Sequence, residues 1–127
     1  MEPLREATLR VTMMPRDTNV HGTIFGGIIL SYIDQAGAVR ARQLGCFNLV
    51  TVAMDGVVFH APVYVGDLVS FYTRELRTGR TSVRIHVVVE AVRYADNSVV
   101  KVTEAEVVYV NLDDNRRPLP VPRPGGC

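Results

Sequence analysis

One helical pattern constrains the fold of this 127-residue chain more than any other feature of its sequence. From Phe25 to about Leu44 the apolar residues return every three or four positions, which places them on one face of an α-helix. That face comprises Phe25, Ile28, Ile29, Tyr32, Ile33, Ala36 and Val39. Nearly all of the chain after it alternates apolar and polar residues with the period of a β-strand. Because one amphipathic helix needs a sheet to cover its apolar face, we expect an α+β fold with an antiparallel sheet wrapped around one long central helix.

The alternating segments predict one strand before the helix and four after it. Their residue ranges are 7–14, 49–61, 68–77, 81–94 and 98–111. Short turns separate the last four, which makes consecutive strands antiparallel. Gly56 interrupts the second strand, where a glycine marks a bulge or the close approach of another backbone. A sheet that curls around one helix leaves an edge strand and the far side of the helix uncovered, so we expect the chain to form a homodimer.

Composition excludes several classes of protein. The chain has the length of one domain, 1–127, and we expect an extended proline-rich tail from about residue 116. A net charge of +1 argues against nucleic-acid binding, and no run approaches the ~20 apolar residues that span a membrane. The first residues do not resemble a secretory signal, so we expect a cytoplasmic protein. The two cysteines and three histidines are too widely spaced to predict a disulfide framework or a metal site.

Asp34 is predicted to lie across the helix from the apolar face, among mostly small residues. These neighbours are Gly27, Leu30, Ser31, Gly37, Ala38 and Ala41. A solvated helix face more often carries Lys, Glu and Gln, so the small residues indicate that another chain or a ligand approaches this carboxylate closely. The alternative is an ordinary exposed aspartate on a surface helix.

Gly26 and Gly27 stand where the helix should begin. The first amides of a helix have no partner within it and carry partial positive charge, and glycine lets a ligand come close to them. Such amides can bind a polarised carbonyl oxygen or a developing oxyanion. The alternative is that both glycines only form the turn before the helix.

These features belong to a longer motif. It consists of Asp17-Thr18-Asn19, Gly22, Ile24-Phe25-Gly26-Gly27, Ile33-Asp34 and Gly37-Ala38. Further matching positions are Val50-Thr51-Val52, Phe59, Pro62, Val65-Gly66-Asp67, Ser82-Val83 and Thr103-Glu104-Ala105. Over nearly its whole length the chain resembles the hotdog-fold acyl-CoA thioesterases. The nearest branch is that of the short bacterial acyl-CoA hydrolases, which is related to the cytosolic acyl-CoA hydrolases of animals.

The resemblance implies that Asp34 is the catalytic residue, as general base toward water or as nucleophile. It also implies that Asn19 orients the water or the thioester, while the amides of Gly26 and Gly27 bind the carbonyl oxygen. Thr23 is expected at the substrate, at a position where relatives often carry Asn or Asp. The sequence contains no Gly-x-Ser-x-Gly elbow that would point to a serine nucleophile instead.

Two further groups of residues are expected to contact the substrate. Coenzyme A carries phosphates, so Arg77 and Arg80, together with Ser82, are expected to bind it at a hairpin turn. Thr51 and Phe59 are expected to contact the acyl-pantetheine from a neighbouring subunit. The alternatives are an ordinary charged hairpin and simple packing in a strand. Coenzyme A is part of the substrate, and no separate cofactor or metal is expected.

Two other functions stay open on the sequence. A hotdog hydratase or dehydratase would use a histidine at the helix, and none lies between Phe25 and Cys46. A non-enzymatic acyl-CoA binding or sensing module has no need of the Asp34 carboxylate beside the thioester. The resemblance further implies that dimers assemble into tetramers or hexamers.

Overall fold

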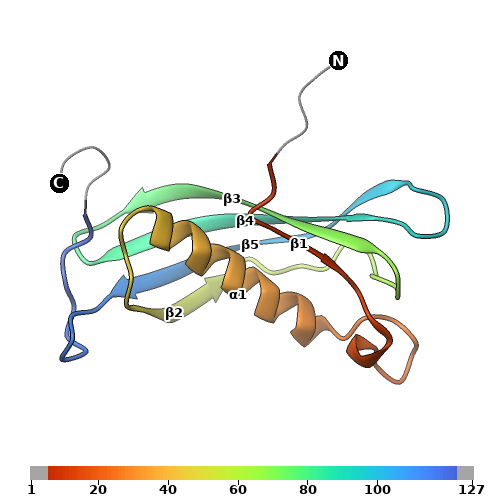
Figure 1. Ribbon diagram of the computed structural model, residues 1–127, viewed down its shortest axis with the longest axis horizontal. Helices are drawn as coiled ribbons and strands as arrows, with labels where there is room; N and C mark the ends of the chain where they lie inside the picture. The colour runs from red at the N-terminus through yellow and green to blue at the C-terminus, as the bar shows by residue number, and fades with distance from the viewer. Residues whose placement is uncertain (1–5, 123–127) are drawn as a thin grey trace, which may run out of the picture.

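The computed structural model describes residues 6–122, which form one antiparallel sheet with an α-helix packed on one of its faces (Figure 1). The strands follow the spatial order β1-β3-β4-β5-β2. They are β1 Leu9–Thr12, β2 Leu49–Asp55, β3 Leu68–Thr78, β4 Ser82–Val92 and β5 Val99–Asn111. The helix α1 spans Gly26–Gln43, and a short 3-10 helix, η1, spans Pro15–Asp17. The predicted architecture is confirmed, and the element ends lie within two residues of the prediction except at the end of β2.

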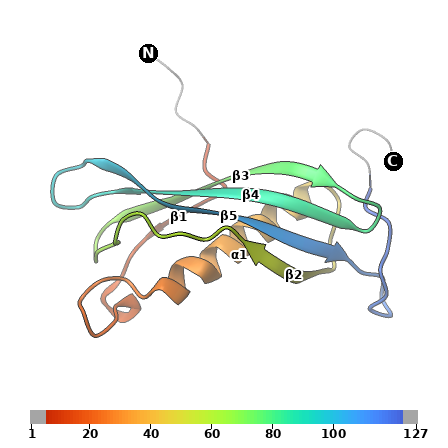
Figure 2. The same cartoon turned by 180° about the vertical axis from the view of Figure 1, so that it is seen from behind.

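The core lies between α1 and the central strands β3, β4 and β5. β4 shows how the alternating pattern produces this arrangement, because its inward residues are buried while its outward residues are partly exposed. The inward residues of β4 are Val83, Ile85, Val87, Val89 and Ala91. Seen from behind, the sheet lies in front of α1, and no described helix covers its outer face (Figure 2).

The buried face of the helix overlaps the predicted apolar face but is rotated from it. Its buried residues are Ile29, Ile33, Ala36, Gly37 and Ala41. Phe25, which was placed on the apolar face, is 56% exposed. The prediction is confirmed for Ile29, Ile33 and Ala36 and wrong for Phe25. It gave weight to large apolar residues, whereas Gly37 and Ala41 let the helix main chain approach the sheet. Asp34 therefore lies at the edge of the buried face, beside β2, rather than across the helix from it.

β2 is shorter than predicted and ends at Asp55. Gly56 has a φ of +71°, in the left-handed region, where the extended ladder cannot continue. Among the described residues of one chain, nothing lies within 4 Å of the position that a Cβ on Gly56 would occupy, so no backbone of the same chain approaches closely there. The bulge occurs earlier, where the register with β5 shifts between Thr51 and Ala53.

The segment after Gly56 still follows β5 without forming a strand. The amide of His60 donates to the carbonyl oxygen of Val102 over 2.8 Å. The hydroxyl of Thr103 donates to the carbonyl oxygen of Val58 over 2.7 Å. These bonds hold residues 57–63 beside the first turn of α1, where they form one wall of a pocket.

β2 is an edge strand, and apolar side chains remain exposed along it. Val50 is 37% and Val52 54% exposed, and the β2 side that faces away from β5 has no described strand beside it. No helix in the described range combines the length and the apolar character that crossing a membrane requires.

The proline-rich tail lies along the sheet as far as it is described. The amide of Val121 donates to the carbonyl oxygen of Arg80, and the amide of Leu119 donates to that of Asn111, both over 2.8 Å. Residues 123–127, the rest of the predicted tail, lie outside the described residues.

Candidate functional site

Asp34 lies in the middle of α1 on the side that faces β2. The hydroxyl of Thr51 donates a hydrogen bond of 2.7 Å to Oδ1 of Asp34. Asp34 is partly buried and Thr51 is exposed, so the pair lies at the boundary between the core and the uncovered edge of the sheet. The β2 bulge begins directly after Thr51. The structure thus brings together two residues that the sequence assigned to catalysis and to substrate binding.

Tyr109 on β5 contacts α1 at the same residue from the sheet side. Its hydroxyl donates a hydrogen bond of 2.6 Å to the main-chain carbonyl oxygen of Asp34, and the side chain is 1% exposed. Burial and the nearby negative charge of Asp34 both raise the pKa of Tyr109, so its hydroxyl stays a donor. Tyr109 is not among the residues predicted at the site. Its one sequence signal is that a tyrosine on the inward face of a strand needs a hydrogen-bond partner in the core.

The helix begins at Gly26, as predicted, and Phe25 supplies no side-chain cap to its first amides. The ring of Phe25 lies over Gly27, where a Cβ would be 2.5 Å from a ring carbon. Gly26 faces Phe59, and a Cβ at Gly26 would be in ordinary contact with that ring at 3.7 Å. The uncapped helix start therefore opens beside two aromatic rings.

Asn19 and Thr23 are brought together in the loop before α1. The side-chain oxygen of Asn19 accepts hydrogen bonds from the amides of His21 and Thr23, at 2.8 and 3.3 Å. Its side-chain nitrogen donates to the hydroxyl of Thr23 over 2.9 Å. Asparagine commonly closes a turn on its own backbone in this way. In one chain the amide group of Asn19 thus shapes the loop.

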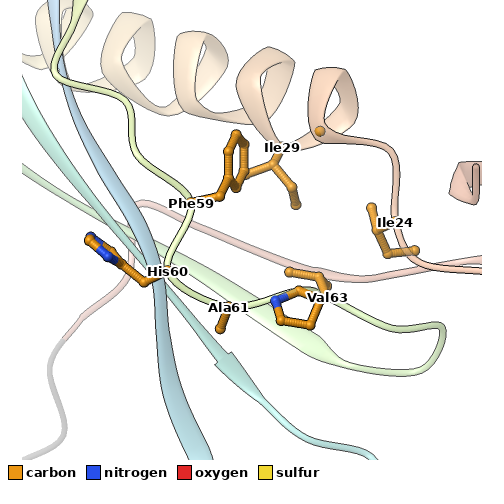
Figure 3. Close-up of a pocket in the computed structure, with 8 residues that line it drawn as sticks. Ile24, Ile29, Phe59, His60, Ala61 and Val63 are labelled. Atoms are coloured by element: carbon orange, nitrogen blue, oxygen red, sulfur yellow. The ribbon is translucent and has the colours of Figure 1, made fainter. Parts of the chain in front are cut away.

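A pocket of about 370 Å³ opens at the start of α1 (Figure 3). Its walls come from the helix start and from the segment after β2. They are Ile24, Gly26, Ile29, Phe59, His60, Ala61, Pro62 and Val63. Most of this lining is apolar, while the main chain of Gly26 offers a polar contact. Of these residues, only Gly26 and Phe59 were predicted at the site. Ile24 and Pro62 belong to the motif without an assigned role, and the fold brings the others beside them.

The predicted coenzyme-binding residues lie at the other end of the helix. Arg77 and Arg80 are exposed near the turn between β3 and β4, and Ser82 begins β4 (Figures 1 and 2). Both views place this turn at the end of the molecule where α1 ends, whereas Gly26 and Gly27 lie where it begins. Within one chain, these residues therefore do not join the pocket.

Asp34 and the helix start are also separated within one chain. Gly26 and Gly27 precede Asp34 by eight and seven residues, which corresponds to about 10–12 Å along the helix axis. A base that acts through one water lies within about two hydrogen-bond lengths, or roughly 6 Å, of the reacting carbon. One chain thus presents a carboxylate and a set of uncapped amides about two helical turns apart.

The model of the family described as "Thioesterase superfamily" matches residues 21–93. The acyl-CoA thioester hydrolase YciA of Salmonella typhimurium is 39% identical over 126 residues, which cover 97% of this chain and 95% of that protein.

Solved structures show the same architecture. A hexameric hotdog-fold thioesterase of Campylobacter jejuni is 42% identical, with a TM-score of 0.86 over 92% of this chain and 90% of that chain. A hexameric thioesterase from Yersinia pestis is 38% identical, with a TM-score of 0.88 over 97% of this chain and 100% of that chain.

Proposed function

The chain belongs to the thioesterase superfamily, and we propose that it hydrolyses the thioester of acyl-CoA to the free acid and coenzyme A. Its fold is the expected hotdog fold, one helix packed against a five-stranded antiparallel sheet. The observation that carries the proposal is Asp34, a carboxylate at the rim of the core beside an uncovered strand edge, held by Thr51. YciA-type relatives are acyl-CoA thioester hydrolases by name, which supports the substrate class.

In the proposed mechanism Asp34 acts as general base. It takes a proton from water while the water oxygen bonds to the carbonyl carbon of the thioester. The carbonyl oxygen becomes an oxyanion, which the free amides at Gly26 and Gly27 stabilise. The carbon–sulfur bond then breaks, and the coenzyme A sulfur leaves with the proton from Asp34. The products are the carboxylic acid and the thiol of coenzyme A.

We propose that each site combines two copies of the chain. The separation of about 10–12 Å along α1 supports this, because one helix then supplies its carboxylate to one site and its first amides to another. The edge of β2, with Val50 and Val52 exposed, is a surface that pairing with a second copy would cover. Solved relatives are hexameric, and we propose a hexamer built from such dimers for this chain.

We propose that the pocket at the helix start holds the acyl chain. Its apolar walls at Ile24, Ile29 and Val63 suit a hydrocarbon, and Gly26 places the free amides at its rim. Ala61→Phe should fill this space and reduce hydrolysis of long acyl-CoA esters far more than that of acetyl-CoA. Equal losses on both substrates would reject this assignment. Because acyl-CoA esters are made and used inside cells, a cytoplasmic location is part of the proposal.

The first experiment measures thiol release from coenzyme A esters of increasing chain length. Asp34→Asn removes the base while keeping the shape of the side chain, so activity should fall at least about 100-fold with the fold and assembly unchanged. Circular dichroism and light scattering provide the controls. Full activity of the Asn variant would reject the mechanism. Acyl-CoA binding by the unaltered protein without any thiol release would instead favour a binding or sensing module.

A mixing experiment tests the shared site. Asp34→Asn chains have intact helix starts, and Gly26→Val chains have intact carboxylates but a crowded pocket. If each site uses both, mixed dimers have one working site, and random pairing should restore about a quarter of normal activity. Each variant alone should be almost inactive. If mixing restores nothing although mixed oligomers form, both groups act within one chain.

Oxygen-labelled water separates the two roles proposed for Asp34. With Asp34 as base, the acid formed in a single turnover carries the label from water. With Asp34 as nucleophile, the carboxylate displaces the coenzyme A thiolate and forms a mixed anhydride with the acyl group. Water that opens this anhydride at the Asp34 carboxyl carbon leaves an unlabelled oxygen in the first acid and puts the label into Asp34, where it is detected by mass spectrometry of the protein.

A further inference from the structure

We propose that Tyr109 is a positioning residue for the reaction: its hydroxyl holds the main chain of α1 at Asp34 and, with Thr51, sets the direction of the carboxylate. This inference rests on the proposed function of Asp34 and extends it to a residue outside the site motif. The carrying observation is the 2.6 Å hydrogen bond from the Tyr109 hydroxyl to the carbonyl oxygen of Asp34 itself.

The two bonds to Asp34 come from one place in the sheet. Thr51 and Tyr109 are direct partners in the register between β2 and β5, so their side chains project side by side toward α1. Thr51 binds the carboxylate at 2.7 Å, and Tyr109 binds the main chain of the same residue at 2.6 Å. Two attachments to one residue from adjacent strands restrict both the position of the helix and the rotation of the side chain.

Gly37 makes this contact possible. A Cβ on Gly37 would lie 3.0 Å from two ring carbons of Tyr109 and closer still to its hydroxyl oxygen. Only a glycine on this turn of α1 therefore lets the tyrosine reach the carbonyl oxygen of Asp34. Gly37 and Tyr109 thus depend on each other, because the missing side chain at Gly37 leaves room for the Tyr109 hydroxyl to contact the helix main chain.

Tyr109 is suited to this role at any pH at which the enzyme works. Its side chain is buried, and Ile33, Ala36 and Gly37 of the overlying helix are buried with it. Burial and the Asp34 charge raise its pKa, so it does not ionise and lose its donor. Since the ring does not line the pocket, the hydroxyl acts on the reaction through Asp34.

Tyr109→Phe tests the proposal because it removes one oxygen and keeps the ring. We expect kcat to fall about tenfold while KM changes less than about twofold, because substrate contacts remain and the base is less well held. Tyr32→Phe is the matched control. It removes the same hydroxyl from a tyrosine whose ring packs on Phe71, and it should leave kcat unchanged. A normal kcat in Tyr109→Phe would overturn the proposal.

A double-variant cycle separates positioning from general structural damage. If Tyr109 acts through Asp34, then Tyr109→Phe should cost nothing further in the Asp34→Asn background. If it costs the same factor there, the proposal is wrong and Tyr109 supports the fold alone. The two proposals fail in different ways. Full activity of Asp34→Asn would reject Asp34 as the general base. An inactive Asp34→Asn variant together with a fully active Tyr109→Phe variant would reject only the positioning role of Tyr109.

Discussion

The hydroxyl of Thr51 on β2 donates a 2.7 Å hydrogen bond to the carboxylate of Asp34 on α1. The bond joins the edge strand to a helix that otherwise packs on the three central strands. It assigns Thr51 a direct role at the carboxylate, in addition to the substrate contact that the sequence predicts. One residue of the edge strand thus touches both the proposed base, Asp34, and the uncovered edge of the sheet.

Thr51→Val should lower kcat about tenfold, because one hydrogen bond to a charged group is lost. Valine has the shape of threonine and suits a strand, so stability should change by less than about 0.5 kcal/mol. Steady-state kinetics and thermal unfolding measure the two effects. Thr51→Ser keeps the hydroxyl and should retain most activity; if serine is as damaging as valine, the hydroxyl is not what matters.

Gly37→Ala should destabilise the protein by about 1–3 kcal/mol through crowding against Tyr109. Alanine favours helix over glycine, so an unstrained site would show the opposite sign. Removing the hydroxyl with Tyr109→Phe should recover part of this loss, since the oxygen is the nearest atom. Thermal midpoints of the two single variants and the double variant, measured at one protein concentration, give the coupling between Gly37→Ala and Tyr109→Phe. If the two changes in stability simply add, the proposed crowding between these residues is wrong.

Arg80→Ala should raise the KM for acyl-CoA about three- to tenfold with little effect on kcat, if Arg80 binds a phosphate of coenzyme A. The KM of the variant should also depend less on salt, since a charge–charge contact has been removed. Arg42→Ala removes the same charge from the end of α1 and serves as control. An unchanged KM in the Arg80 variant excludes it from phosphate binding.

Asp67→Asn should reduce stability by about 3 kcal/mol at neutral pH, because it leaves the guanidinium of Arg93 without its buried partner. Asp67 is 2% exposed, and its carboxylate accepts bonds from Arg93 and from the amides of Tyr64 and Tyr94. Burial alone would raise the pKa of Asp67, but the bonds from Tyr94, Tyr64 and Arg93 outweigh it and lower the pKa.

The lowered pKa gives this prediction a pH signature. The stabilisation from Asp67 is complete above the ordinary aspartate pKa of about 3.9 and is lost as pH falls toward the lower value in the folded protein. The difference in thermal midpoint between the natural protein and Asp67→Asn should therefore shrink in acid. Asp114→Asn, at an exposed carboxyl, should show little difference at any pH. A gap that stays constant into strong acid would show that the charge of Asp67 is not responsible.

Sequence periodicity was sufficient to predict the helix and the strands. The helix between Phe25 and Leu44 and the alternation from 81 to 94 are local patterns, and local backbone geometry follows from them directly. β2 ends earlier than predicted because Gly56 takes a left-handed conformation. The residues on both sides of Gly56 favour strands, so the sequence pattern gave no sign of this end. The buried face of α1 was placed only in part, because Gly37 was assigned to a side that another chain or a ligand approaches, whereas Tyr109 of the same chain packs against it.

The sequence by itself determined that one helix lies on an antiparallel sheet and that Asp34 and the helix start are the residues to examine, because motif and period are properties of neighbouring residues. Only the tertiary structure decided that Tyr109 and Thr51 hold Asp34 together and that the helix start opens into a pocket walled by residues 59–63. These contacts join residues 17 to 75 positions apart, and such pairings depend on strand register and packing, which no local pattern encodes.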